Sequence, residues 1–260
     1  MSSHLLEPRD RHGAIWSSLV SVACLLRSLP LFLGAPPKTP LRVLGIIALD
    51  TVHVLRRGRA LPRQKIREVA MFLDFAGCMN AAWDRKELCA SEYRTVRQRL
   101  DQAGLGSCMN DYLERLQAIE RWRPSIGGDY RRFDEIRSYR EAVAGLTLAK
   151  AAAIALDDES LEDANTDTLL RILMQCQIID DVLDYEADRS AGLPSFLTAA
   201  PTRPEAIALT ADTSRHYAER ESSSTCAALP LRLALWAAST LAQLVVRVAD
   251  QPMIVRLAGI

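Results

Sequence analysis

The sequence predicts an all-α protein that folds as a single helical domain over residues 1–260. Apolar residues recur with helical spacing along nearly the whole chain, and no segment alternates polar and apolar residues as a half-buried strand does. No linker divides the chain, and 260 residues are enough to bury one large core. With 49% hydrophobic and 25% charged residues, the composition is that of an ordinary globular domain.

Turn signals divide the chain into nine expected helices. The divisions, most of them marked by glycine or proline, fall in order at residues 34–37, 57–58, 104–106, 124–129, 157–165, 192–194 and 201–204. Several of the helices are apolar on more than one face, which predicts a bundle with fully buried central helices. The expected helices cover residues 14–33, 40–56, 62–86, 91–103, 107–122, 132–156, 166–188, 204–220 and 228–250.

Two apolar runs, at residues 14–35 and 229–260, are long enough to be considered as membrane-spanning segments. A spanning helix needs about 20 apolar residues without interruption. Arg27 interrupts the first run, and Arg232 and Arg247 interrupt the second. We therefore expect both runs to form helices buried in the protein, without stable membrane insertion. Peripheral contact of either run with a membrane surface stays open.

Charge, cysteines and missing motifs exclude several classes of function. The 32 basic and 32 acidic residues cancel, so the net charge predicts no attraction of the whole chain to nucleic acid. The six cysteines form no CxxC pair and no zinc-finger spacing, which favours reduced thiols in a cytoplasmic protein. The four histidines include no Glu-x-x-His pair, so a di-iron carboxylate bundle is not expected. The sequence also lacks the HExxH, P-loop, GxSxG and GxGxxG motifs.

The strongest functional signal is a row of carboxylates in the helix expected at residues 166–188. Asp180, Asp184 and Asp188 are spaced at i, i+4 and i+8, which places them on one helix face, and Asp181 flanks them. Like charges one turn apart repel each other, and no basic residue is interleaved with them. A divalent cation is the simplest compensation, and Mg²⁺ prefers oxygen ligands shared with substrate phosphates. The row therefore predicts a magnesium site, with a plain helix-end charge as the alternative for Asp188.

Residues 178–189, which read Ile-Ile-Asp-Asp-Val-Leu-Asp-Tyr-Glu-Ala-Asp-Arg, resemble a known motif. They are similar to the second aspartate motif of the class IB, or large, terpene synthases, which belong to the isoprenoid synthase superfamily. The resemblance implies that Asp180 and Asp184 are catalytic metal ligands. The turn at residues 190–196 is similar in the class IB enzymes and in the squalene/phytoene synthases. Gln177 stands where the squalene/phytoene synthases have a glutamine, which implies a contact with substrate.

Residues 77–85 are similar to the first motif of the class IB family, DYLDNLCDR, in an eroded form. Asp84 matches the pattern, whereas Asn80 stands where an aspartate is usual. The resemblance implies that both residues hold metal, since an amide oxygen can bind Mg²⁺, and that Asp84 is catalytic, with a structural role as the alternative for Asn80. The lower negative charge predicts weaker metal binding at this first site. Residues 48–52 resemble the first motif of squalene synthases, which makes Asp50 a secondary candidate.

A third similarity lies in the helix expected at residues 132–156. Residues 141–148 are similar to the class IB stretch EFxAAxGSTL, and their small side chains either allow close helix packing or leave room for a ligand. Four arginines near the start of this helix are candidates to bind a diphosphate, with a solvated charge as the alternative for each: Arg131, Arg132, Arg137 and Arg140. Four aromatic residues are candidates to line an apolar pocket, with core packing as the alternative: Phe72, Phe75, Trp83 and Tyr139.

The resemblance implies an isoprenoid synthase-like helical bundle with a central active-site cavity. Its activity would be that of a class I terpene synthase, a lyase that uses Mg²⁺ to ionise a C15 or C20 prenyl diphosphate. The carbocation is then cyclised or loses a proton, and pyrophosphate is released. Two alternatives stay open: head-to-head condensation, as in the squalene/phytoene synthases, and a non-catalytic accessory subunit that binds isoprenoids. Condensation of two prenyl diphosphates would require two well-charged metal sites, so the low negative charge of the first site favours the terpene synthase. A homodimer also stays open.

Overall fold

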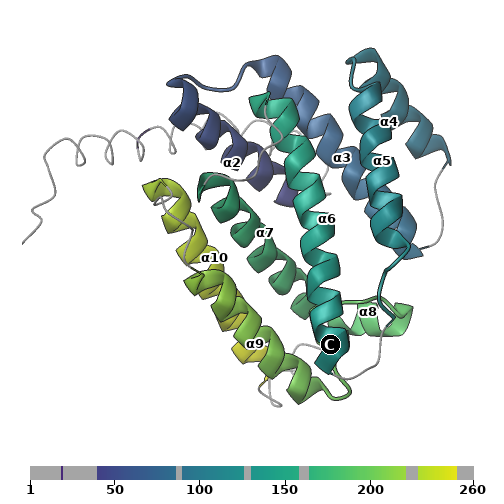
Figure 1. The fold of residues 1–260 in the computed structure, drawn as a ribbon, viewed down its shortest axis with the longest axis vertical. Helices are drawn as coiled ribbons and strands as arrows, with labels where there is room; N and C mark the ends of the chain where they lie inside the picture. The colour runs from purple at the N-terminus through teal and green to yellow at the C-terminus, as the bar shows by residue number, and fades with distance from the viewer. Residues whose placement is uncertain are drawn as a thin grey trace, which may run out of the picture.

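The computed structural model describes residue 19 and residues 40–85, 90–125, 130–157, 164–220 and 228–250. All regular structure in these ranges is helical, which confirms the all-α prediction. The helix expected at residues 14–33 lies outside the described residues, except for Leu19. The helices are labelled in Figure 1: α2 (Pro40–Arg57), α3 (Arg63–Arg85), α4 (Ala90–Gln102), α5 (Gly106–Glu120), α6 (Tyr130–Leu156), α7 (Ala164–Leu183), α8 (Tyr185–Ala191), the short 3₁₀ helix η1 (Phe196–Thr198), α9 (Arg203–Glu219) and α10 (Leu229–Ala249).

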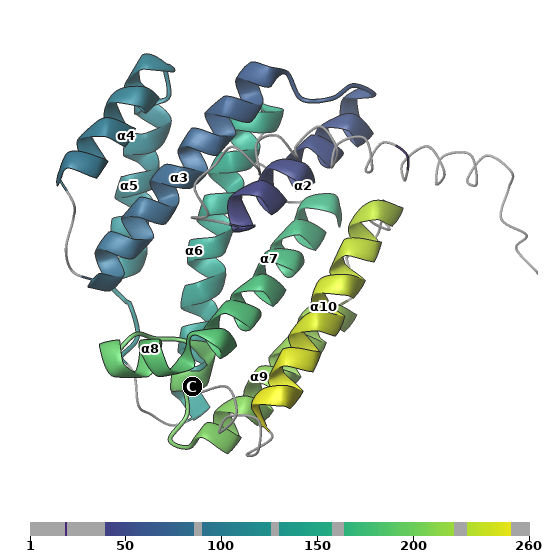
Figure 2. The same ribbon diagram turned by 180° about the vertical axis from the view of Figure 1, so that it is seen from behind.

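The expected bounds of the described helices agree with the observed ones to within three residues, apart from one break. The segment expected as one helix over residues 166–188 forms two, because α7 ends at Leu183 and α8 begins at Tyr185. The break falls at Asp184, and α8 turns across the end of α7 (Figures 1 and 2). No glycine or proline marks this position, so the sequence carries no local signal for the bend.

Helix α6 runs along the middle of the bundle, with the other helices in two groups around it (Figure 1). On one side, α3 and α5 pack against α6, and α4 packs against α3 and α5. On the other side, α7 packs against α6, and α9 and α10 pack against α7. Helix α2 contacts α3, α6 and α7. The C-terminal ends of α3 and α7 both approach α8, so the two motif-bearing segments reach the same end of the bundle (Figure 2).

The core of the described residues consists of two clusters of buried apolar side chains. In the first, between α2, α3, α5 and α6, Phe72 and Phe75 pack edge to face against Tyr112. The second lies between α7, η1, α9 and α10 and includes Phe133 and Phe196. Phe72 and Phe75 are fully buried, so for these two residues the core-packing alternative is correct.

The described part of the C-terminal apolar run, residues 229–250, is buried on one face only, although we expected it to be buried. Helix α10 packs against α7 and α9 and buries Leu235, Ala242 and Val246. Several large apolar side chains on its other side are exposed. Among the described residues, α10 is the one helix whose length and apolar composition would suffice to cross a membrane.

Candidate functional site

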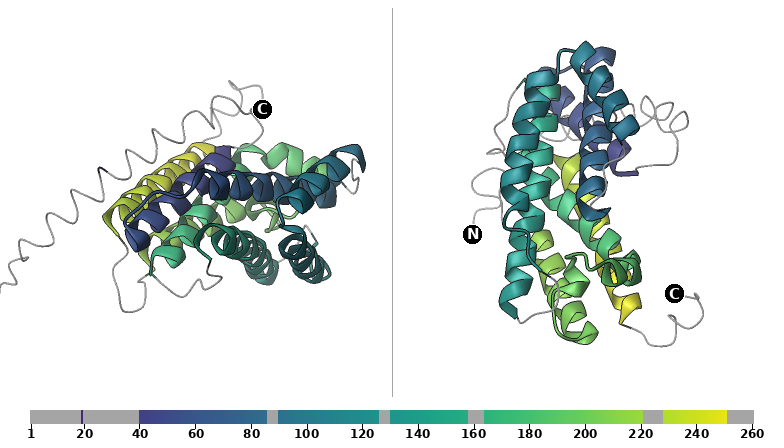
Figure 3. Two further views of the ribbon diagram at one scale, coloured as in Figure 1. Left: turned by 90° about the horizontal axis from the view of Figure 1, so that it is seen from above. Right: turned by 90° about the vertical axis from the view of Figure 1, so that its right-hand side faces the viewer.

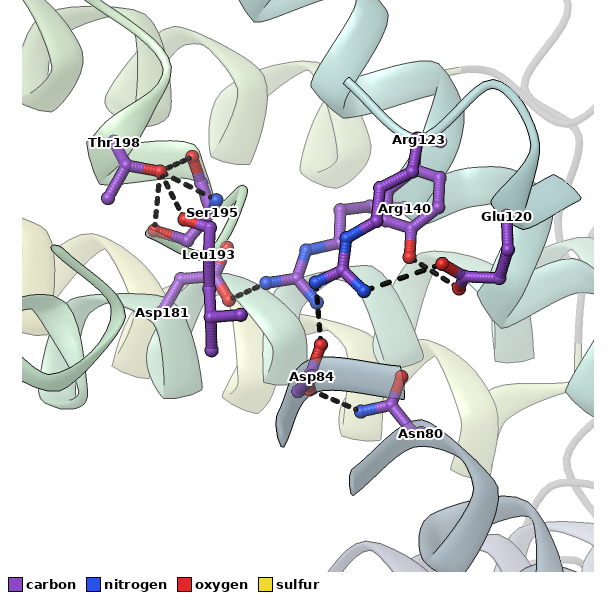
Figure 4. A network of polar contacts seen from close by, with 10 residues as sticks. Asn80, Asp84, Glu120, Arg123, Arg140, Asp181, Leu193, Ser195 and Thr198 are labelled. Carbon is purple, nitrogen blue, oxygen red and sulfur yellow. Dashed lines mark hydrogen bonds and ion pairs between the residues drawn. The ribbon is translucent and has the colours of Figure 1, made fainter. Parts of the chain in front are cut away.

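The eroded first motif lies at the C-terminal end of α3. The side-chain amide of Asn80 donates to Asp84 Oδ2 at 3.3 Å, so the two residues share one helix face as expected. Asp84 Oδ1 accepts a second, shorter bond of 2.7 Å from Nη2 of Arg123 (Figure 4). Asp84 is therefore already paired with a cation that the protein itself provides.

Arg123 is a residue of this site that the sequence reasoning missed. It lies in the turn after α5, where its Nη1 is 3.4 Å from the carboxylate of Glu120. The hydroxyl of Tyr139 donates to the same carboxylate at 2.7 Å, and the Arg123 guanidinium lies 5.8 Å from the centre of the Tyr139 ring. Burial and the bond to Glu120 raise the pKa of Tyr139, which keeps its proton. Tyr139, a candidate for lining a pocket, is thus buried and helps to hold Arg123.

The second motif is organised around Asp181, which the sequence reasoning treated only as a flanking residue. Asp181 is 2% exposed, and Nη2 of Arg140 donates to its Oδ1 at 2.7 Å. Its other oxygen accepts the backbone N–H of Phe196 at 2.7 Å. Burial raises the pKa of Asp181 to about 7, although Arg140 and the Phe196 amide both favour the ionised form.

The turn after α8 supplies the Phe196 donor. Gly192 ends α8 in the left-handed region, with a φ of 69°, which glycine adopts without strain. The amide of Leu193 then donates to the carbonyl of Asp188 at 2.8 Å, and the hydroxyl of Thr198 donates to the carbonyl of Leu193 at 2.8 Å. These bonds fold the chain back, so that the start of η1 meets α7 (Figure 4).

The row Asp180, Asp184 and Asp188 keeps its helical spacing through the bend between α7 and α8. The amide of Asp184 donates to the carbonyl of Asp180, and the amide of Asp188 donates to that of Asp184, each at 2.9 Å. Partial burial and the neighbouring Asp184 raise the pKa of Asp180, although much of its side chain is exposed to solvent. Burial also raises the pKa of Asp188, as do Asp184 and Asp84. The repulsion between Asp188 and Asp84 means that the two motifs lie close to each other.

Arg140, from α6, lies between the two acidic segments. Figure 4 shows its guanidinium beside that of Arg123, with Asp181 and Asp84 as their respective partners. Burial lowers the pKa of Arg140, but the carboxylates of Asp181, Asp84 and Asp188 outweigh it and raise the pKa. Its Nε is buried and has no hydrogen-bond partner among the described residues. Arg140 is thus the cation that both motifs share.

The remaining candidates differ in where they lie. Arg137 pairs with the exposed Asp134 at 3.1 Å, and Arg132 donates to Ser125 at 3.3 Å. The side chain of Arg131 lies outside the described residues. Trp83 is partly exposed on α3, and Gln177 is half-buried on α7.

Two further buried polar residues have structural partners. Gln175, not Gln177, is fully buried on α7, and its amide donates to Ser214 and Ser239 and so ties α7 to α9 and α10. Asp50 is also fully buried, and its Oδ1 accepts the backbone N–H of Leu61 at 2.6 Å, which fixes the loop between α2 and α3. Its Oδ2 is buried without a hydrogen-bond partner among the described residues.

The candidate metal ligands near Arg140 suit a hard cation, since all of them are side-chain oxygens of aspartate or asparagine. In the described part of the chain, no group of three or more acidic, histidine or cysteine side chains converges closely enough to hold a metal ion. Mg²⁺ usually keeps several waters and takes one or two carboxylates together with substrate phosphates, so it does not require a closed cage. The mutual repulsion of Asp180, Asp184 and Asp188 is the feature that a cation would relieve.

Comparisons of the chain with models of protein families, with curated proteins and with solved structures find no significant match.

Proposed function

We propose that the chain is a class I terpene synthase, with an isoprenoid synthase-like bundle, that uses Mg²⁺ to ionise a prenyl diphosphate. One observation supports the proposal best: the guanidinium groups of Arg123 and Arg140 lie side by side and pair with Asp84 of α3 and Asp181 of α7, each at 2.7 Å. Such a mixture of carboxylates and guanidinium groups suits a ligand made of phosphates and divalent cations. The resemblance of both segments to aspartate motifs is the second, independent support.

In this proposal, the row Asp180, Asp184 and Asp188 holds the cation from the second motif, and Asn80 and Asp84 hold it from the first. When bound, Mg²⁺ supplies positive charge that stabilises the negative charge developing on the leaving diphosphate. Arg140 has donors beyond the one given to Asp181 and would bind a diphosphate oxygen. Asp181 orients Arg140, and the Phe196 amide in turn orients Asp181.

The apolar part of the substrate needs space beside the charged groups, and two glycines offer it. A Cβ atom built at Gly145 on α6 or at Gly77 on α3 meets no atom within 4 Å. Gly77 is exposed and lies seven residues before Asp84, on the same face of α3 and about 10 Å along it. Gly145 is half-buried and lies five residues beyond Arg140, about 140° around α6 from it. We expect the prenyl chain to run from the charged groups past Gly77.

A non-catalytic isoprenoid-binding protein is the second candidate, and a specific observation favours it. Asp84 and Asp181 are already neutralised by Arg123 and Arg140, each at 2.7 Å. A protein that had lost catalysis could keep these ion pairs for stability alone. Head-to-head condensation has weaker support, because the amide of Asn80 lowers the charge of the first site.

The test is incubation of the full chain with C10, C15 and C20 prenyl diphosphates, with Mg²⁺ or with EDTA. The terpene synthase proposal predicts Mg²⁺-dependent release of pyrophosphate and hydrocarbon or alcohol products visible by mass spectrometry. Asp180→Asn should abolish release without lowering the melting temperature, because it removes a ligand and also a like-charge repulsion. Asp134→Asn, an exposed carboxylate on α6, is the matched control and should keep full activity.

Two other results would argue against the proposal. A melting temperature that rises with a prenyl diphosphate regardless of Mg²⁺, without turnover, would favour the binding protein. A strongly lowered melting temperature of Asp180→Asn would make Asp180 a structural residue.

A further inference from the structure

The outer side of α10 carries a stripe of exposed apolar side chains. They recur at helical spacing on the side of the helix away from the buried Leu235, Ala242 and Val246. Trp236, at 69%, and Leu233, at 53%, are among the most exposed. Figures 2 and 3 show α10 on the outside of the bundle, with α9 behind it. The stripe consists of Leu229, Leu233, Trp236, Leu241, Leu244 and Val248.

Exposed large apolar residues are concentrated on this one helix. Of the ten such residues among the described part of the chain, six belong to the stripe. Together they expose roughly 500 Å², near the top of the range for the largest apolar patch on a monomeric protein. A patch of this size on one helix indicates an interaction surface rather than scattered surface residues.

The charge of α10 favours a lipid surface as the partner. A stable protein–protein interface takes about 800 Å² from each side, of which a little over half is apolar, so the area of the stripe by itself suits either kind of partner. A membrane interface requires no complementary shape, and tryptophan is enriched there. The helix contains two exposed arginines, Arg232 and Arg247, and no acidic residue between Leu229 and Ala249. An amphipathic helix with apolar and basic residues of this kind binds anionic bilayers.

We propose that α10 docks the protein on an anionic membrane surface, with the stripe in the interface and Arg232 and Arg247 at the lipid headgroups. The helix lies in the plane of the bilayer, because its other face is packed against α7 and α9. The docking surface does not depend on the proposed function. If that function holds as well, docking would bring the site close to a phase in which prenyl chains dissolve.

The test is co-sedimentation of the full chain with vesicles of phosphatidylcholine alone or with about one third phosphatidylglycerol. We expect binding to the anionic vesicles that weakens with salt, since each basic residue near such a surface is worth roughly fivefold in affinity. Leu233→Glu should lose most of the binding. Leu183→Glu is the matched control, because Leu183 is 63% exposed but lies at the end of α7. Substituting Arg232 and Arg247 together by glutamine should weaken binding to the anionic vesicles by roughly 25-fold.

Leu233→Glu changes an exposed residue, and its melting curve should match that of the parent protein. If it melts lower, Trp236→Ser replaces it in the comparison. Absence of vesicle binding by the parent protein, or equal loss of binding in Leu233→Glu and Leu183→Glu, overturns the proposal. A dimer in analytical ultracentrifugation that Leu233→Glu converts to a monomer, without vesicle binding, would assign the stripe to a second copy of the chain. Equal affinity for neutral and anionic vesicles would contradict the proposed contact of the two arginines with anionic headgroups.

Discussion

Replacing Arg140 by glutamine should destabilise the protein, and most strongly above neutral pH. Arg140 donates to Asp181 at 2.7 Å, and Asp181 is only 2% exposed. Without the guanidinium, the carboxylate keeps one donor, the amide of Phe196. Removing one partner of a buried ion pair costs about 3–5 kcal/mol, because the remaining charge is left buried without compensation. Here the carboxylate takes up a proton instead, because the pKa of Asp181 is about 7 even beside Arg140, so we expect a loss of about 1 kcal/mol at pH 8. This corresponds to a fall in melting temperature of roughly 2–4 °C for a chain of this length.

The loss of stability in Arg140→Gln should become smaller in mild acid. Burial raises the pKa of Asp181 to about 7, and Arg140 restrains it from rising further. Removing Arg140 therefore raises the pKa again, further above that of an aspartate in the unfolded chain. The folded variant then binds a proton at a pH where the unfolded chain binds none, so the stability of the variant rises as the pH falls. From about pH 8 down to pH 5.5, the difference in the free energy of unfolding between parent and variant should decrease by about 1 kcal/mol.

Urea unfolding followed by circular dichroism at the two pH values measures this directly. Arg137→Gln is the matched control, because Arg137 lies on the same helix and pairs with an exposed carboxylate, and its effect should stay below about 0.5 kcal/mol. Adding Asp181→Asn to Arg140→Gln should recover most of the loss, since the unpaired charge is gone. Equal losses in Arg140→Gln and Arg137→Gln, or a loss that neither pH nor Asp181→Asn changes, would refute the reasoning.

Three further predictions concern the first motif and follow from the proposed function. Asp84→Ala should lower the rate of pyrophosphate release by about 10²-fold or more, and full activity in this variant would exclude α3 from the site. Asn80→Asp restores the charge that is usual at this position, so half-saturation should shift to lower Mg²⁺ in a titration of the rate. An unchanged titration would mean that Asn80 does not contact the ion. Arg123→Gln frees Asp84 from its 2.7 Å ion pair, so calorimetry should detect tighter binding of Mg²⁺ alone. Weaker binding would instead make Arg123 necessary for the shape of the site.

Much of the fold could be predicted from the sequence because helix ends depend on local chemistry. Gly104 and Gly192 have φ values of 75° and 69°, which other residues adopt only with strain, and each follows within two residues of a helix end. Pro204 lies in the first turn of α9, where its missing N–H costs nothing. The boundary that the sequence failed to predict, at Asp184, has no glycine or proline to mark it. The bend there accompanies bonds to a distant segment, such as that from the Phe196 amide to Asp181.

The sequence alone determined which residues carry charge near the site, through the helical spacing of Asp180, Asp184 and Asp188 and of Asn80 and Asp84. Only the tertiary structure decided which carboxylate has which partner. Asp84 pairs with Arg123, and Asp181 pairs with Arg140, about forty positions away in each case. Helical periodicity predicts which residues share a helix face, but the packing of separate helices determines which counter-ion each carboxylate has. Burial then determines how strong the electrostatic interaction of the pair is. For this reason Asp181, a flanking residue in the sequence, lies at the centre of the site.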